Sequence, residues 1–223
     1  MNQQVIRTAR TSVLPTVTVN RVLRNTYALL AMLFLFGAAT SWLAMTQGWY
    51  IGFWPFLIGI FVFSFAINAA RNSAWGIVLG FAFAGLLGVV TGSNVNYALS
   101  AYSNGGTLVV AAFGLTAVMF VGLSAYAMVT KRDFSGWIGF LSVGTLAIIG
   151  AFVLNYFLQV PALWLALSTM IVLLACGWIV WQTQMIVRNG QTNYILAATG
   201  LLADIFVLFN NLLALLGLGF GED

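Results

Sequence analysis

The chain has 223 residues, of which 62% are hydrophobic and only 5% are charged. A soluble domain carries roughly 25% charged residues, so this composition excludes a soluble globular protein and indicates an integral membrane protein. The formal net charge of +4 does not indicate nucleic-acid binding, because the basic residues flank apolar segments, where they orient membrane helices. We therefore expect the lipid bilayer as a partner and no nucleic acid.

Seven apolar segments follow one another along the chain. About 20 apolar residues in a helix cross the hydrocarbon core of a bilayer. The sequence therefore predicts an all-α membrane bundle of seven transmembrane helices, at residues 27–46, 51–70, 74–92, 107–129, 137–157, 162–187 and 194–218. Residues 1–26 are low in aromatics and show no helical periodicity, so we expect a disordered tail before the membrane domain of residues 27–218. Residues 219–223 form a short second tail.

All eight basic residues fall on one side of this predicted topology. They precede the first segment or follow the second, fourth and sixth: Arg7, Arg10, Arg21, Arg24, Arg71, Lys131, Arg132 and Arg188. Positive charges flank membrane helices on the cytoplasmic side. We expect the amino terminus in the cytoplasm and, after seven spans, the carboxyl terminus outside.

The third segment carries a small residue at every fourth position. This stripe consists of Gly76, Gly80, Ala84, Gly88 and Gly92. In lipid, helices associate largely through close backbone approach, which small residues permit. We interpret the stripe as an internal packing surface; the alternative is an interface between two copies of the chain.

Asp204 is the only charged residue within residues 194–218. A charge near the bilayer centre costs at least about 2.5–3.5 kcal/mol, so such residues usually face the bundle interior and take part in function. The alternative is a neutral carboxyl group that only joins helices by a hydrogen bond. Asn211, two helical turns further on, shares a face with Asp204. It is either a polar partner of Asp204 or a surface residue near the outer leaflet.

Several chemistries are excluded by composition. The chain has no histidine, its one lysine, Lys131, lies between predicted spans, and Asp204 is the only acid within a span. Histidine-dependent metal sites, serine–histidine proteases, intramembrane aspartyl proteases and Schiff-base lysines are therefore absent. We expect a non-enzymatic protein without a cofactor or metal site.

Two segments carry recognisable motifs. The first contains Tyr126 and the run Lys131, Arg132 and Asp133, and the second contains Thr192, Asn193 and Tyr194, followed by Asp204. The first is similar to the end of the fourth span of the Bax inhibitor-1 superfamily, and the second resembles that family's last helix. Residues 22–27 look most like the YccA branch, found in bacterial inner membranes. The resemblance covers about residues 20–218 and implies a multi-pass protein of that membrane.

The resemblance implies two activities. Some family members are pH-sensitive calcium leaks, in which an Asp on the sixth span and an Asp on the seventh share a proton and gate a pore. The YccA branch is associated with the membrane-anchored, ATP-driven protease FtsH, as a substrate-like modulator that restrains it. The seventh-span acid corresponds to Asp204, whereas the sixth-span acid corresponds to Gln182.

The glutamine changes the chemistry of the pair. Two carboxylates in contact titrate together, whereas an amide donates to an ionised carboxylate or accepts from a protonated one. Contact between Gln182 and Asp204 would therefore depend less on pH. One carboxylate with amide oxygens is also a poor calcium site. Asp204, Gln182 and Asn211 are the candidate ion- or pH-sensing residues; alternatively, Gln182 and Gln184 are ordinary polar residues near the membrane interface.

We predict a modulator of FtsH, with residues 1–26 as the handle that the protease engages. Alternatively, this tail serves only to orient the protein. A second hypothesis is a cation leak centred on Asp204, with weak calcium binding. A third is a structural subunit that packs against a larger membrane assembly.

Overall fold

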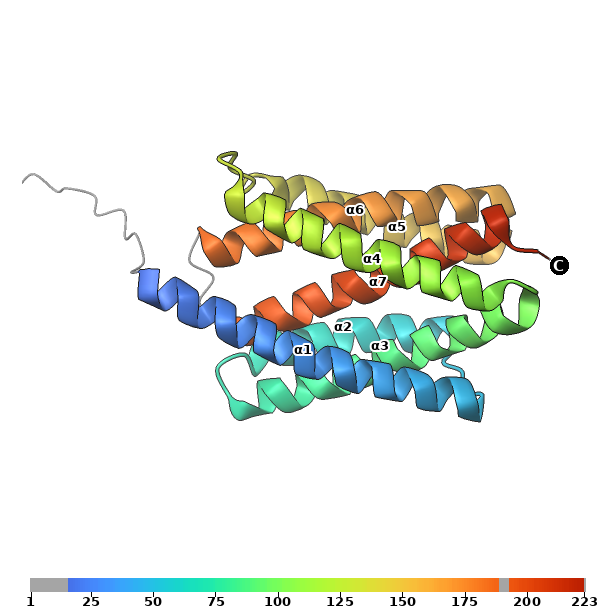
Figure 1. Cartoon of the computed structure of the whole chain (residues 1–223), viewed down its shortest axis with the longest axis horizontal. Helices are drawn as coiled ribbons and strands as arrows, with labels where there is room; N and C mark the ends of the chain where they lie inside the picture. Colours follow the sequence, from blue (N-terminus) through green and yellow to red (C-terminus); the bar gives the residue numbers. More distant parts are fainter. Residues whose placement is uncertain (1–15, 189–192, 223) are drawn as a thin grey trace, which may run out of the picture.

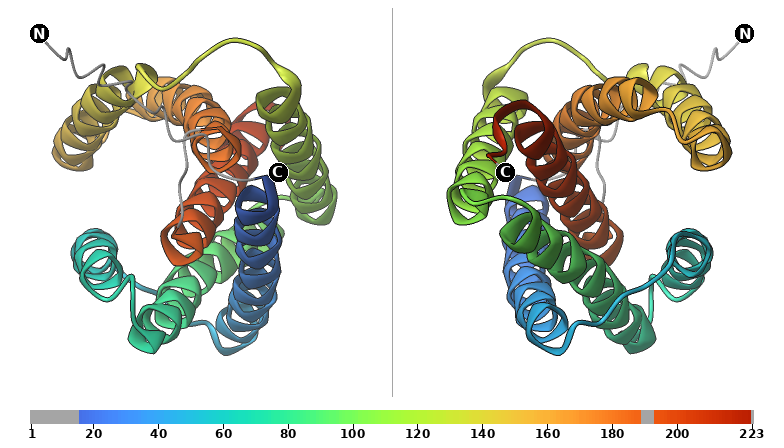
Figure 2. Two further views of the ribbon diagram at one scale, coloured as in Figure 1. Left: turned by 90° about the vertical axis from the view of Figure 1, so that its left-hand side faces the viewer. Right: turned by 90° about the vertical axis from the view of Figure 1, so that its right-hand side faces the viewer.

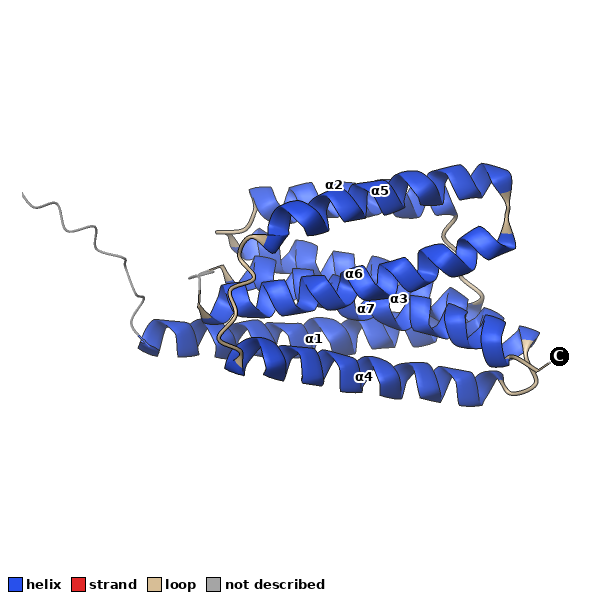
Figure 3. Ribbon diagram, turned by 90° about the horizontal axis from the view of Figure 1, so that it is seen from above, coloured by secondary structure: helices blue, strands red, loops and turns tan. Residues whose placement is uncertain are grey.

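The computed structural model describes residues 16–188 and 193–222 and, within α1, the side chains from residue 20 onward. This part of the chain forms seven helices without a strand: α1 (Thr16–Gln47), α2 (Phe53–Ala69), α3 (Ala74–Ala101), α4 (Gly105–Val129), α5 (Trp137–Leu158), α6 (Pro161–Val187) and α7 (Tyr194–Phe220). The helices run roughly along one long axis (Figures 1 and 3). The predicted all-helical bundle is therefore confirmed.

Six of these helices are long and apolar enough to cross a membrane. The exception is α2, an apolar helix of 17 residues, which at 1.5 Å per residue is about 26 Å long, slightly less than a typical hydrocarbon core. The composition and these helices make the chain an integral membrane protein. The seventh crossing and the direction of insertion stay predictions.

Two helices extend beyond the apolar segments. α1 begins at Thr16, so the predicted disordered tail of residues 1–26 is wrong for its last eleven positions. The helix continues because Val22 and Leu23 pack against the main core; residues 1–15 lie outside the described residues. α3 continues to Ala101, and its polar last turns are held to α7 by the hydrogen bond from Asn94 to Asn210.

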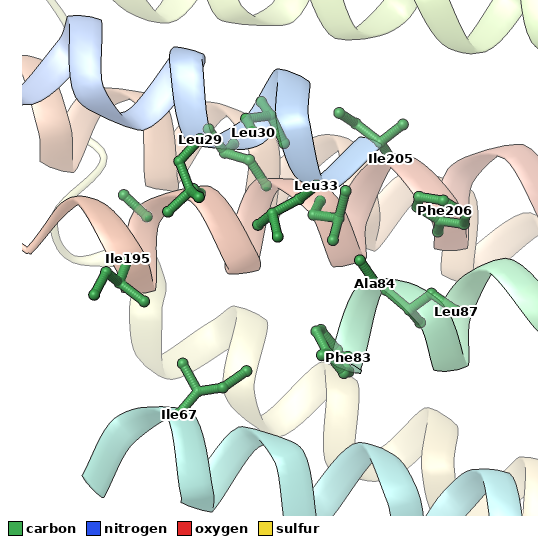
Figure 4. Close-up of a cluster of buried hydrophobic side chains, with 14 of the residues drawn as sticks. Leu29, Leu30, Leu33, Ile67, Phe83, Ala84, Leu87, Ile195, Ile205 and Phe206 are labelled. Carbon is green, nitrogen blue, oxygen red and sulfur yellow. The ribbon is translucent and has the colours of Figure 1, made fainter. Parts of the chain in front are cut away.

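α7 lies near the middle of the bundle, as the end-on views show (Figure 2). It packs against α1, α2, α3, α4 and α6. The main core forms where α7 meets α1 and α3, and Figure 4 shows Leu33, Phe83, Ala84, Ile195 and Phe206 gathered there. The helix that carries Asp204 is therefore held from several sides.

The small-residue stripe of α3 is an internal packing surface, as predicted. All five members are buried. A Cβ atom added at Gly88 would run into the carbonyl oxygen of Gly37 on α1, and one at Gly92 would run into that of Ser41. Glycine at these positions is required because the backbones of α1 and α3 touch.

α2 and α5 flank the bundle on one side, and their backbones stay apart. No Cα atom of α2 lies within 8 Å of α5, and the end-on views place them at the two tips of a horseshoe (Figure 2). Their contact is made by aromatic rings where α2 begins and α5 ends. The ring of Phe53 lies 4.8 Å from that of Tyr156 and 5.7 Å from that of Phe152, centroid to centroid.

The described basic residues gather at one end of the bundle, which we call the basic end. It contains the start of α1, the α2–α3 and α4–α5 connections and the end of α6 (Figure 1). Arg188 donates a hydrogen bond to the carbonyl oxygen of Thr130, and Asn193 donates one of 2.7 Å to that of Arg71. This clustering agrees with the one-sided distribution predicted from the sequence. Its assignment to the cytoplasm stays a prediction.

Candidate functional site

The polar centre of the bundle is a hydrogen bond between α6 and α7. Nε2 of Gln182 donates to Oδ2 of Asp204 over 2.6 Å. Both side chains are partly buried. The structure thus brings together the two residues that correspond to the acid pair of the Bax inhibitor-1 resemblance, with an amide in place of one carboxylate.

Gly200 makes this hydrogen bond possible. It lies one helical turn before Asp204, on the same face of α7. A Cβ atom at this position would collide with Oε1 of Gln182. The amide reaches Asp204 across the bare backbone of Gly200, so three residues make up the centre.

Asp204 lines a cavity of about 700 Å³ between α2, α3, α5, α6 and α7. Most of the wall is apolar. The polar lining residues include Asn94 on α3, Thr145 on α5, and Asn210 and Asn211 on α7. Its lining residues come from the flanking helices α2 and α5 as well as from α7; Figure 2 shows α2 and α5 at the two tips of the horseshoe and α7 between the other helices.

Asn211 faces this cavity but does not bond Asp204. Its Nδ2 donates to the carbonyl oxygen of Val207 over 2.8 Å. Seven residues of α-helix correspond to about 10 Å along the axis, which is beyond hydrogen-bond reach. Asp204 and Asn211 share a face of α7 and therefore line the same cavity, but they do not bond each other.

A second polar link, between α3 and α7, involves a residue that the sequence analysis missed. Nδ2 of Asn210 donates to Oγ1 of Thr91, and Nδ2 of Asn94 donates to Oδ1 of Asn210, each over 2.8 Å. The predicted third span ends at residue 92, so Asn94 lies outside it. Asn94 lies beside Asn210 only because α3 is longer than the apolar run.

Gln184 serves the basic end rather than the cavity. Its side chain is 1% exposed. Oε1 accepts a hydrogen bond of 2.6 Å from the backbone N–H of Phe134, and Nε2 donates one of 2.7 Å to the carbonyl oxygen of Arg132. Because a buried amide with both ends bonded to backbone fixes its partners in place, Gln184 holds the α4–α5 connection against α6.

The family-motif residues of the α4–α5 connection surround this contact. The ring of Tyr126 lies 6.2 Å from that of Phe134, and Lys131 and Arg132 are exposed. Oδ1 of Asp133 accepts a hydrogen bond of 2.9 Å from the backbone N–H of Ser135. Hydrogen bonds from the backbone and side chain of Ser135 lower the pKa of Asp133. These residues shape a surface at the basic end.

The motif at the start of α7 is a helix cap. Oδ1 of Asn193 accepts hydrogen bonds of 3.1 Å from the N–H groups of Ile195 and Leu196, which are otherwise unpaired in a first turn. Its Nδ2 also bonds the α2–α3 connection, at the carbonyl oxygen of Arg71. Tyr194 packs against the main core. Thr192 lies outside the described residues.

The opposite end of α7 is tied to the α3–α4 connection. The N–H of Ser103 donates to the carbonyl oxygen of Glu222 over 2.8 Å, and Nδ2 of Asn104 donates to that of Phe220, also over 2.8 Å. The ring of Tyr102 covers Gly217 and Gly221. α7 is thus attached at both ends and at its centre.

The described residues contain no group of three His, Cys, Asp or Glu side chains that could hold a metal ion. Among the described residues that line the cavity, Asp204 is the one carboxylate, and its polar neighbours in the wall include amide groups. Such a set can hold one positive charge or donate and accept single hydrogen bonds.

Comparison with known proteins shows the family to which the sequence is similar. The model of the family described as "Inhibitor of apoptosis-promoting Bax1" matches residues 19–221. An uncharacterized protein of Pseudomonas aeruginosa is 37% identical over 206 residues, covering 92% of each chain. The "Modulator of FtsH protease YccA" of Escherichia coli (strain K12) and the "Inner membrane protein YccA" of Escherichia coli O6:H1 are each 37% identical over 211 residues, covering 93% of each chain.

These relatives and the six long apolar helices identify a multi-pass protein of the bacterial inner membrane. The names of the family and of the relatives point to a non-enzymatic role. The match extends over nearly the whole described bundle, including the α6–α7 centre and both attached ends of α7. The chain therefore belongs to the Bax inhibitor-1 family.

Proposed function

We propose that the chain is a modulator of the membrane protease FtsH, acting as a substrate that the protease engages but extracts slowly. The name of the similar YccA protein of Escherichia coli supports this proposal. Engagement would begin at the segment before α1, which the predicted topology puts in the cytoplasm with the basic end. The protease would then have to pull the helices out of the bundle.

The attachment of α7 is the observation that carries the proposal. Asn193 holds its first turn to the α2–α3 connection, Gln182 bonds Asp204 at its centre, and Asn104 holds its last turn. The helix also packs against five others. Pulling the chain from one terminus would have to break these contacts in succession.

The bilayer makes each of these polar contacts harder to replace. In water, a broken hydrogen bond is exchanged for bonds to solvent, whereas the bilayer core supplies no such partner. Asp204 lies ten residues after the start of α7, within its apolar run, and Gln182 lies five residues before the end of α6. A tightly held bundle of this kind would occupy the protease and slow its turnover of other substrates.

The other hypotheses have less support. A pH-gated leak needs a second acid beside Asp204, and the side chain that bonds it is Gln182. The described residues of the cavity wall add amides but no further carboxylate to Asp204. One carboxylate with amide oxygens is a poor calcium site. No contact among the described residues specifically supports the third hypothesis, that the chain is a structural subunit of a larger membrane assembly.

The direct test measures FtsH activity in proteoliposomes. Purified FtsH is reconstituted with a fluorescent membrane substrate, with and without an equimolar amount of this chain. We expect wild type to slow degradation of the reporter and to be degraded slowly itself. A variant lacking residues 2–14, which leaves α1 intact, should restore reporter turnover.

The matched control replaces residues 2–14 by a flexible sequence of equal length. Recovery of inhibition with this replacement would show that any unfolded end is sufficient. Unchanged reporter turnover in the presence of the wild-type chain would contradict the proposed function.

A further inference from the structure

One carboxylate oxygen of Asp204 has no hydrogen-bond partner among the described residues. Oδ2 accepts the amide hydrogen of Gln182 over 2.6 Å, whereas Oδ1 accepts none. The residue lines the cavity of about 700 Å³. A positive charge placed beside a carboxyl group in a largely apolar cavity stabilises its ionised form, and the carboxylate stabilises that charge in turn.

The cavity wall suits an organic cation. Its aromatic lining includes Phe53, Phe56, Phe152, Trp164, Trp178 and Phe206. Aromatic faces attract cations and also pack against apolar groups. Neither lysine nor arginine is among the described lining residues, so no positive side chain of the wall competes for Asp204.

The size and position of the cavity favour a lipid-soluble ligand. Small-molecule sites typically have volumes of about 300–1,000 Å³, and this cavity falls within that range. It lies between α2 and α5, which have no Cα atoms within 8 Å of each other. In a membrane this open side faces lipid, so a ligand with an apolar body can enter from the bilayer.

Other ligand classes fit less well. A divalent metal ion prefers several oxygen ligands with carboxylates among them, and the cavity wall offers one carboxylate. An anion would be repelled by Asp204. A neutral apolar molecule would bury the carboxylate without a partner for Oδ1, which is unfavourable.

We propose that this cavity is a binding site for a monovalent organic cation with an apolar body, whose charge pairs with Asp204 while aromatic side chains enclose the body. Gln182 positions the carboxylate by bonding Oδ2, which leaves Oδ1 for the ligand. The site is independent of the proposed action on FtsH, because it requires only the folded bundle.

The test measures binding of tetraphenylphosphonium, a permanently charged lipophilic cation. The full chain is placed in phosphatidylcholine nanodiscs, and bound probe is measured by equilibrium dialysis against empty nanodiscs as background. We expect saturable binding to wild type and at least about tenfold weaker binding to Asp204→Asn, because the charge pair is lost. The uncharged analogue triphenylphosphine oxide should bind weakly to both.

Two further variants separate a binding effect from a folding effect. Leu57→Trp keeps Asp204 but fills part of the cavity from α2, so it should also weaken binding. Asp133→Asn removes an exposed carboxylate outside the cavity and should bind like wild type. Thermal unfolding of each variant in the same nanodiscs confirms that the bundle is intact.

A second lipid arm identifies the source of the cation. Phosphatidylethanolamine in the nanodisc should compete with the probe if the natural ligand is a lipid amine headgroup, and should leave binding unchanged if it is a free organic amine. Either result is compatible with recognition of an organic cation by the cavity. Absence of saturable binding to wild type, or equal binding to Asp204→Asn, would overturn the proposal.

Discussion

Nε2 of Gln182 on α6 lies 2.6 Å from Oδ2 of Asp204 on α7, and the backbone of Gly200 lies directly beside this contact. In the family resemblance, Gln182 corresponds to the sixth-span acid of the calcium leaks, so that comparison puts an amide where the leaks have a carboxylate. The amide donates a hydrogen bond to the carboxylate and does not share a proton with it. Replacing the amide by an acid, or its neighbouring glycine by a larger residue, therefore changes the centre of the bundle in defined ways.

Gly200→Ala should destabilise the bundle through Gln182. The added Cβ displaces Oε1 of Gln182 and breaks its bond to Asp204, at a cost of about 0.5–1.5 kcal/mol. In a Gln182→Ala background the Cβ has room, and the same substitution should be neutral or slightly stabilising because alanine favours helices. Thermal unfolding of the four proteins measures this double-mutant cycle. Equal destabilisation in both backgrounds would rule out the steric link.

Gly88→Ala should be more damaging, because its obstacle is backbone. The added Cβ meets the hydroxyl oxygen of Thr40 and the carbonyl oxygen of Gly37. The hydroxyl can rotate away but the backbone cannot, so α1 and α3 would have to separate at a cost of about 1–3 kcal/mol. Gly114→Ala on α4 is the matched control, since nothing lies within 4 Å of its added Cβ. Unfolding temperatures in the same detergent compare the two. Similar stability of both variants would show that the α1–α3 contact is looser than described.

Gln184→Ala should release the α4–α5 connection. The change leaves the N–H of Phe134 and the carbonyl oxygen of Arg132 without their partner, at a cost of about 1–3 kcal/mol for buried groups. Trypsin should then cut after Lys131 and Arg132 faster than in wild type. Gln182→Ala, two residues away, is the control and should not change this cleavage. If Gln184→Ala does not change the cleavage rate, Gln184 does not hold the α4–α5 connection against α6.

Asn104→Ala should loosen the last turn of α7. Its side chain donates to the carbonyl oxygen of Phe220 over 2.8 Å and accepts from the N–H of Glu222 over 3.3 Å. Losing both bonds at this exposed site should cost about 1 kcal/mol and speed hydrogen exchange at Ser103 and Glu222. Ser100→Ala provides the comparison, because the Ser100 hydroxyl bonds only carbonyls of its own helix. If both variants exchange at the same rate, the hydrogen bonds of Asn104 do not hold the end of α7 in place.

The positions of the helices followed from the sequence, but some of their ends did not. Apolar runs locate the membrane helices because lipid accepts only segments whose backbone is internally bonded. α1 begins at Thr16 and α3 ends at Ala101, in polar stretches that apolar runs do not reveal. The first extension depends on the packing of Val22 and Leu23 against other helices. The second depends on bonds such as that between Asn94 and Asn210.

The sequence by itself determined that this protein is a membrane bundle with one intramembrane acid, Asp204, and a small-residue stripe on α3. These properties depend on local composition and periodicity, which need no knowledge of neighbours. Only the tertiary structure decided that Gln182 bonds Asp204, that Asn211 does not, and that Gln184 holds a connection. The reason is that a hydrogen bond depends on distances of a few tenths of an ångström between helices, whereas a sequence pattern specifies only which face of a helix a residue occupies.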